Sequence, residues 1–313
     1  MSHYIVMAVI RNGAGINGYE GALESLLAPY DENKEVNPYI RSTRAQIIKE
    51  GRERCRQFAD ELKVAETIEG IDEKDCASKF REAMPDAPHR YQSVVDPTWG
   101  RRYAALAEGT DEEILALMNE LEYDGRLDEN GNYISTYNLN SKWDWYEVGG
   151  RWSGQLKLKK RITNAERQMY DLSSDSALAT YIDWDAMFQL DPERKARLEE
   201  FWNLAVLRNL PEEAGQTEEE RDRWVINNYG IFTNPAYYFE TYGTLEEYLR
   251  RQAIWCPYAV VDEKGWYAPG EMGWFGCSSE TSEQKKDWEE NFRARFIDTL
   301  KPNDRIVMVD CHI

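Results

Sequence analysis

The chain has 313 residues, of which 42% are hydrophobic and 30% charged, as in an ordinary globular protein. Its 11 Trp and 19 Tyr exclude a disordered chain, because disordered chains lack the large apolar side chains that build a core. A net charge of −19 argues against direct nucleic-acid binding, which depends on clustered Lys and Arg.

Strand-like segments lie at both ends of the chain. Residues 4–10 and 305–313 are apolar and β-branched, and residues 255–261 share this character. The Asp-Glu-Lys-Gly sequence at 262–265 is typical of a turn, and we expect it to join residues 259–261 to residues 266–268. The sequence therefore predicts a hairpin late in the chain and strands at both termini.

Helices with clear start signals lie between these strands. In a capping box, Thr precedes Glu or Gln by three residues, and each side chain satisfies a backbone N–H of the other residue. This pattern begins at Thr43, Thr110, Thr217, Thr244 and Thr281. Apolar residues recur at helical spacing over about 44–63, and Asp191-Pro192 is typical of a further helix start.

The order of the predicted elements indicates an α+β fold, since strands and helices do not alternate regularly. We expect a mixed or antiparallel sheet core from residues 1–35, 130–160 and 252–313, built from both termini and a central hairpin. Residues 40–125 form a helical excursion and residues 163–250 a helical insertion in this interpretation.

The central hairpin is predicted from the segment Lys-Trp-Asp-Trp-Tyr-Glu-Val-Gly-Gly-Arg-Trp, which runs from Lys142 to Trp152. Gly149 and Gly150 can both take positive φ, which a two-residue type I′ turn requires. We therefore expect strands near 143–148 and 151–158.

Alternation along the first of these strands predicts two faces. Asp144 and Tyr146 would share one face, and Trp143 and Trp145 the other. Arg151 would pair with Asp144 or reach an anionic ligand. The segment thus fits either a buried aromatic hairpin with an Arg–Asp clamp or a platform on which a nucleobase stacks.

A glycine-rich loop follows the later hairpin, at residues 269–277. Three glycines within seven residues indicate an irregular loop, and it carries Glu271 and Trp274. Glu271 is a candidate general base or hydrogen-bond acceptor. The glycine spacing does not match a nucleotide-binding fingerprint, and the simpler interpretation is a loop packed against the central hairpin.

The C-terminal Val-Asp-Cys-His-Ile carries metal-ligating and nucleophilic side chains. Asp310 and His312 would share one face of a strand, and Cys311 would point to the other. One more carboxylate would make a metal site, and the candidates are Asp31, Glu32 and Glu271. A single His with dispersed acids is weak support for a metal, so we expect none here and favour a hydrogen-bonded His.

The five cysteines are scattered without a Cys-x-x-Cys pair, which argues against a disulfide framework or a zinc cluster. The first ten residues lack the basic region of a signal peptide, and no apolar run is long enough to span a bilayer. We expect a cytoplasmic protein with no cofactor and no membrane contact.

Four segments together resemble a set of proteins encoded by bacteriophages and prophages. They are residues 27–33 (Leu-Ala-Pro-Tyr-Asp-Glu-Asn), 142–154, 270–276 (Gly-Glu-Met-Gly-Trp-Phe-Gly) and 309–313. In its size and acidity the chain is similar to the anti-defence proteins that block the Gabija nuclease system. The resemblance implies a protein that is not an enzyme, that self-associates around the host complex and that keeps DNA from the nuclease.

The leading hypothesis is therefore a phage-encoded inhibitor that occludes a host defence complex in the bacterial cytoplasm, as a homo-oligomer and without catalysis. Its acidity would speed encounter with a basic partner. The alternative is a binding protein or hydrolase for a nucleotide-derived small molecule. A DNA mimic is disfavoured, because the acids show no periodic spacing. The candidate ligand or interface residues are Lys142, Trp143, Asp144, Trp145, Tyr146, Arg151, Trp152, Glu271, Trp274, Asp310 and His312.

Overall fold

The structure, a computed structural model, describes residues 2–11, 18–230 and 233–313, without the side chain of Trp274. The chain divides into two compact units. The first unit comprises Met1–Lys34 and Asn138–Ile313, and the second comprises Glu35–Tyr137. The fold is α+β with a mixed sheet, as the sequence predicts.

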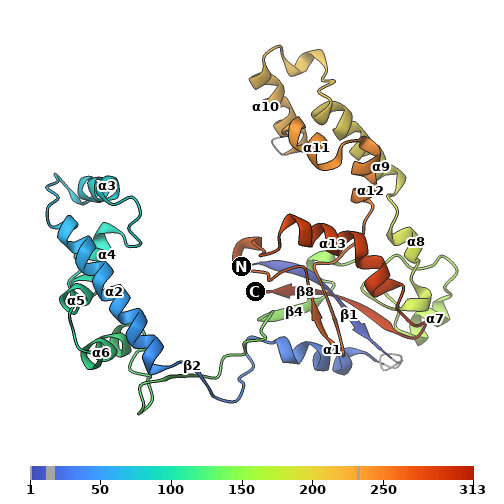
Figure 1. The fold of residues 1–313 in the computed structure, drawn as a ribbon. Helices are drawn as coiled ribbons and strands as arrows, with labels where there is room; N and C mark the ends of the chain where they lie inside the picture. Colours follow the sequence, from blue (N-terminus) through green and yellow to red (C-terminus); the bar gives the residue numbers. More distant parts are fainter. Residues whose placement is uncertain (1, 12–17, 231–232) are drawn as a thin grey trace. The chain divides into compact units, whose positions relative to one another are not determined.

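A six-stranded mixed sheet forms the centre of the described part of the first unit. Its strands are β1 (His3–Ile10), β4 (Trp145–Val148), β5 (Ser176–Leu178), β6 (Ala259–Asp262), β7 (Gly265–Tyr267) and β8 (Arg305–His312). β1 runs antiparallel to β8 along its whole length and parallel to β6. β4 and β5 both pair with the free side of β8, while β7 pairs with β6. The two ends of the chain therefore lie side by side in the middle of the sheet (Figure 1).

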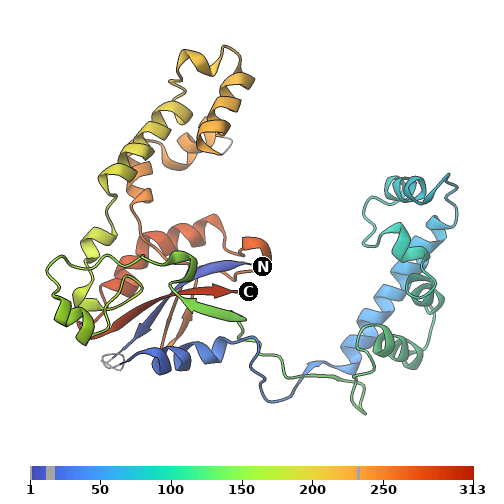
Figure 2. The same ribbon diagram turned by 180° about the vertical axis from the view of Figure 1, so that it is seen from behind.

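Both faces of this sheet are covered, which explains why β1 is apolar over residues 4–10 and β8 over residues 306–309. Helix α1 (Glu20–Leu27) packs on one face, where Leu23 and Leu27 contact Val6 and its neighbours. Helix α13 (Ser282–Phe292) packs on the other face, where Trp288 and Phe292 join Met7 and Met308. Figure 2 shows the two helices on opposite sides of the strands from behind.

Further helices of the first unit follow β4. They are α7 (Asn164–Met169), α8 (Trp184–Met187), α9 (Pro192–Phe201), α10 (Glu218–Tyr229), α11 (Pro235–Tyr242) and α12 (Leu245–Gln252). Helices α9 to α12, here called the α9–α12 bundle (residues 192–252), surround a core of their own with Phe201, Trp202 and Tyr248 at its centre. The predicted insertion 163–250 also supplies β5 to the sheet.

The second unit is mainly helical. It contains β2 (Tyr39–Ser42), α2 (Arg44–Ala65), α3 (Glu73–Ala83), α4 (Tyr91–Val95), α5 (Gly100–Ala105), α6 (Asp111–Leu121) and β3 (Tyr133–Ser135). Helix α2 carries Ile47 and Phe58 on its buried face, and they pack against Tyr103 of α5 and Ile114 of α6. Gly51 lets α6 approach closely, because a Cβ there would lie 2.6 Å from Ile114 Cγ2.

The predicted helix starts are largely confirmed. Complete capping boxes open α2, α6, α10 and α13 at Thr43, Thr110, Thr217 and Thr281. At Thr244 the side chain accepts from the Glu247 N–H, and no reciprocal bond is formed. The sequence analysis missed a further box at Thr163, which opens the short helix α7.

The predicted central hairpin is wrong. Gly149 and Gly150 do take positive φ, at 73° and 48°, but a 3₁₀ turn (Gly150–Trp152) follows them instead of a second strand. β4 pairs with β8, from Trp145 opposite His312 to Val148 opposite Val309. The backbone groups of β4 thus find their partners in a strand more than 150 residues away in the sequence, and β8 gains a neighbour on its free side.

The predicted faces of this segment are also wrong. Trp143 lies before the strand begins, and its ring contacts Tyr146 edge-to-face at 5.1 Å in the core against α1. Trp145 points to the opposite side of the sheet, where it contacts His312. Strict alternation fails here because the chain at Trp143 is irregular and forms only an isolated bridge to Asp31.

Candidate functional site

Two histidine–carboxylate pairs lie together on one face of the central sheet. His3 Nδ1 lies 2.9 Å from Asp310 Oδ1, and His312 Nδ1 lies 2.6 Å from Asp144 Oδ1. The two imidazole rings contact each other edge-to-face with their centroids 4.8 Å apart. We call these four residues the histidine cluster.

The strand register explains why these residues meet. His3 of β1 pairs with His312 of β8, and Trp145 of β4 pairs with the same His312 from the other side. Asp310 lies two residues before His312, so alternation places it on the same face, as the sequence predicts. Asp144 precedes β4 directly and reaches His312 from the end of that strand.

The two carboxylates lie in different environments. The Asp310 side chain is only 1% exposed, and its second oxygen accepts from the Arg151 backbone N–H at 3.0 Å. Gly150 permits this close approach, because a Cβ there would lie 2.5 Å from Asp310 Cβ. The Asp144 side chain is 36% exposed. Asp310 is therefore enclosed by the protein, whereas Asp144 is partly exposed to solvent, and the two imidazole side chains are 12% (His3) and 7% (His312) exposed.

Each histidine uses Nδ1 for its carboxylate, and neither Nε2 is bonded to a residue that the structure describes. A carboxylate on Nδ1 fixes the ring orientation and the tautomer, and it stabilises the imidazolium when the ring is protonated. This arrangement leaves two oriented Nε2 atoms that can accept or donate a proton.

Trp145 lies beside the histidine cluster as an exposed aromatic side chain. Its ring stacks on His312 at 5.6 Å with an interplanar angle of 17°, and it meets His3 edge-on at 5.6 Å. The side chain is 44% exposed, which is unusual for a Trp on a sheet face. Its exposed part offers a flat apolar surface beside the two imidazoles.

A cavity of about 410 Å³ lies next to the cluster along the same sheet face. Its floor includes Ile5, the strand partner of Asp310 and the residue two places after His3. Trp152 and Trp255 contribute aromatic surface, and Lys157 and Arg194 contribute positive charge. Lys157 Nζ donates to the carbonyl oxygens of Ala186 and Gln189, so it is held in place. The volume is within the range of small-molecule sites.

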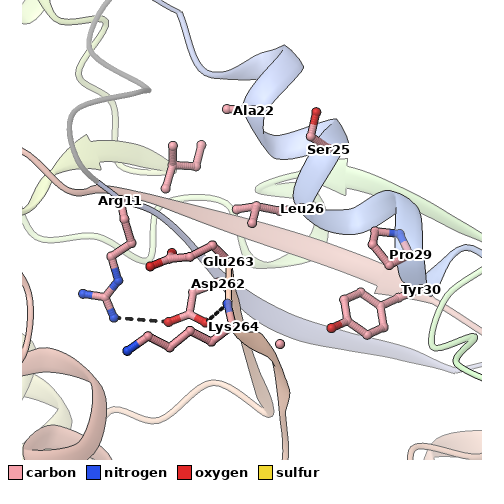
Figure 3. A pocket seen from close by; sticks show the side chains of 11 residues that line it. Arg11, Ala22, Ser25, Leu26, Pro29, Tyr30, Asp262, Glu263 and Lys264 are labelled. Atoms are coloured by element: carbon pink, nitrogen blue, oxygen red, sulfur yellow. Dashed lines mark hydrogen bonds and ion pairs between the residues drawn. The ribbon is translucent and has the colours of Figure 1, made fainter.

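A second cavity, of about 480 Å³, lies at the other end of β1 (Figure 3). Arg11 reaches into it between two carboxylates, at 3.3 Å from Asp262 and 3.1 Å from Asp304. Both carboxylates are buried, and both are held by the guanidinium. Arg11 thus links the ends of β1, β6 and the turn before β8, which is a structural role.

Several predicted site residues lie away from the histidine cluster. Trp143 is buried and donates from Nε1 to the Leu27 carbonyl oxygen at 3.2 Å, and Tyr146 lies in the same core. Lys142 Nζ donates to Glu271 Oε2 at 2.5 Å, which confirms contact between the glycine-rich loop and the start of the Trp-rich segment. The side chain of Trp274 lies outside the described residues.

The predicted clamp between Arg151 and Asp144 is wrong, because Asp144 pairs with His312 and Arg151 contributes its backbone N–H to Asp310. A metal site with Asp31 or Glu32 is not formed either. Among the described residues, no group of three His, Cys, Asp or Glu side chains has the arrangement of a metal site.

Sequence reasoning missed His3. The signal was present, since antiparallel pairing of the two terminal strands would bring a residue near position 3 opposite position 312. Local patterns alone do not indicate His3, because its place opposite His312 depends on the register between the two terminal strands.

No family model, curated protein or solved structure matches this chain. Every helix in the described ranges is too short or too polar to cross a membrane.

Proposed function

We propose that the first unit binds a nucleotide-type small molecule at the histidine cluster and cleaves its phosphate ester by acid–base catalysis. The observation that carries this proposal is the pair of imidazoles 4.8 Å apart, each oriented through Nδ1 by a carboxylate and each with a free Nε2 among the described residues. This is the alternative hypothesis that the sequence left open, and the geometry favours it.

The class of ligand follows from the surroundings. Trp145 offers an exposed ring on which a nucleobase can stack, and the adjacent cavity adds Trp152 and Trp255. Arg194 lines this cavity together with one carboxylate, Asp191, and it forms no ion pair within the described residues, so its guanidinium can meet a phosphate. An aromatic ring and an anionic group on one small molecule match this lining.

The chemistry requires the two histidines in opposite protonation states. The neutral imidazole accepts a proton from water as the water oxygen bonds to phosphorus. The imidazolium donates its proton to the leaving oxygen as the phosphorus–oxygen ester bond breaks. Asp310 and Asp144 stabilise whichever ring carries the charge.

A panel of linear and cyclic nucleotides, followed by ³¹P NMR, tests the proposal. His3→Gln and His312→Gln should each lower turnover by about 100-fold or more, which is the usual size of an acid–base contribution. His89→Gln is the matched control, because His89 is the remaining histidine and lies in the second unit. Thermal shift reports binding separately from turnover. Absence of both turnover and thermal shift with every nucleotide would refute the proposal.

A second candidate is occlusion of a host defence complex, such as the Gabija nuclease complex, by an oligomer of this protein. Exposed apolar side chains on the α9–α12 bundle favour it, namely Ile226, Tyr237 and Phe239. Large exposed aromatic residues are typical of binding hot spots, and the net charge of −19 would draw a basic partner.

Pull-down of a purified defence complex and light scattering of the protein alone test this second function. Tyr237→Ala with Phe239→Ala should abolish capture, whereas His312→Gln should leave it intact. A monomer that captures no complex would rule out occlusion, and it would leave the small-molecule proposal standing.

A further inference from the structure

The α9–α12 bundle carries an open pocket of about 590 Å³, which shares Arg194 with the cavity beside the histidine cluster and otherwise has a different lining. Its floor is aromatic, and residues from all four helices contribute to the lining: Phe201 from α9, Tyr229 from α10, Tyr238 from α11 and Tyr248 from α12. Arg194 and Arg197 line it from the first turns of α9.

Phe201 is the centre of the aromatic floor. Its ring lies 5.2 Å from Tyr229 edge-on, 5.5 Å from Tyr238 and 6.2 Å from Tyr248. These are the distances of favourable aromatic pairs, so the floor is packed and preformed. The wide π turn at Trp202–Val206 directly follows Phe201, and such turns are frequent at functional sites.

Three tyrosines, Tyr229, Tyr238 and Tyr248, bring hydroxyl groups to the lining of this cavity. Tyr248 is 6% exposed, and burial raises the pKa of its phenol to about 12. The hydroxyls of Tyr229, Tyr238 and Tyr248 form no hydrogen bond with a residue that the structure describes, and none of the three is a fully buried group without a partner. A tyrosine hydroxyl can donate a hydrogen bond to an acceptor atom of a ligand in this cavity.

Positive charge lies at the rim. Arg194 and Arg197 are three residues apart on α9, so they share one face of the helix. Lys195 between them pairs with Glu199 at 3.6 Å, whereas neither arginine forms an ion pair within the described residues. One carboxylate, Glu200, also lines the cavity, so the arginines dominate its charge.

We propose that this cavity is a second binding site, for a small planar aromatic acid. The ring of the ligand lies on Phe201 among the tyrosines, and the acidic group meets Arg197 and the Tyr248 hydroxyl. The arginines disfavour an aromatic cation, and the packed floor with closely spaced rings favours a flat ring over a bulky aliphatic group. The site does not depend on the chemistry of the histidine cluster.

Isothermal titration of the full chain with 2-naphthoate tests this site, with cyclohexanecarboxylate and 2-naphthol as comparison ligands. Wild-type protein should bind 2-naphthoate at least tenfold more tightly than either comparison ligand. Arg197→Gln should weaken binding by about tenfold and Tyr248→Phe by severalfold, because each removes one hydrogen bond to the acid. Arg223→Gln, an exposed α10 residue paired with Glu219, should change nothing.

Two outcomes would overturn the proposal. One is equal affinity for cyclohexanecarboxylate and 2-naphthoate, and the other is unchanged binding in both Arg197→Gln and Tyr248→Phe. Tyr248→Phe keeps the ring and its packing, so circular dichroism should show a folded protein and loss of binding would report the missing hydroxyl. His312→Gln should bind 2-naphthoate as wild type does, which separates this site from the histidine cluster.

Discussion

Asp310 Oδ1 lies 2.9 Å from His3 Nδ1, although 307 positions separate the two residues in the chain. The contact exists because the first and last strands pair along their whole length, from His3 opposite His312 to Ile10 opposite Arg305. The histidine cluster therefore forms only when both ends of the chain have joined the sheet. Figure 1 shows the two termini next to each other, where β1 begins and β8 ends.

The first prediction concerns the two carboxylates of the cluster. Asp310→Ala should lower the free energy of unfolding by about 1–3 kcal/mol, because it removes a buried carboxylate that accepts from the Arg151 N–H and pairs with His3. Asp144→Ala should cost less than about 1 kcal/mol, since that side chain is partly exposed to water. Urea denaturation of both variants measures the difference.

Asp310→Asn serves as the control, because its amide oxygen can still accept from the Arg151 N–H. It should retain most of the stability that Asp310→Ala loses. Equal losses for Asp310→Ala and Asp144→Ala would show that the Asp310 contacts contribute no more than a surface ion pair.

The second prediction concerns the glycine next to Asp310. Gly150→Ala should destabilise the protein by about 1–3 kcal/mol, since φ is +48° and the new Cβ would lie 2.5 Å from Asp310 Cβ. It should also shift the imidazole NMR signals of His3, because Asp310 must move. Gly154 also has a positive φ, of +89°, but a Cβ there would meet no atom within 4 Å. Gly154→Ala should therefore lower the free energy of unfolding by about 1 kcal/mol and leave the His3 NMR signals unchanged. Unchanged His3 signals in Gly150→Ala would contradict the close approach.

Much of the sheet could be predicted from local patterns. Residues 4–10 and 305–313 are continuous apolar runs, and such runs mark strands with both faces covered. The turn at 262–265 joins β6 and β7 as its residues indicate. The period of two placed Asp310 and His312 on the same face, which is the part of the site that sequence reasoning found.

The rest of the site depends on which strands become neighbours, and local patterns do not determine that. Gly149-Gly150 has the composition of a hairpin turn, yet β4 pairs with β8 because that strand offers a long unpaired side. Because β4 pairs with β8, Trp145 and Asp144 contact His312 on one face of the sheet. Tyr146 lies in the core on the opposite face. A single register, His3 opposite His312, then supplies the second imidazole.

The third prediction concerns two helical glycines with opposite expected effects. Gly51→Ala in α2 should destabilise the protein by about 1–3 kcal/mol, because its Cβ would lie 2.6 Å from Ile114 and 2.7 Å from Met118. Gly21→Ala in α1 should stabilise it by about 0.4–1 kcal/mol, because the Cβ meets no atom within 4 Å and the unfolded chain loses freedom. Thermal unfolding of the two variants checks the signs. Stabilisation by Gly51→Ala would mean that α2 and α6 are not in close contact.

The fourth prediction concerns the pH dependence of the second unit. Glu61 on α2 is buried, with His89 Nδ1 at 3.1 Å and Phe58 stacked on the His89 ring. Burial raises the pKa of the Glu61 carboxyl above its usual 4.5, although His89 opposes the shift. The folded state therefore holds this proton more tightly than the unfolded state does.

The sign of the effect follows from that difference. Below about pH 4.5 the protonated Glu61 carboxyl makes its full contribution to the free energy of unfolding. This contribution is lost as the pH rises through the raised pKa of Glu61. Glu61→Gln stays neutral at every pH, so it should gain stability over wild type between pH 4 and pH 8. The difference in melting temperature at the two pH values measures this gain. Glu50→Gln, an exposed position on the same helix, should show no such trend. A Glu61→Gln variant that loses stability relative to wild type as the pH rises would mean that the His89 contact outweighs burial.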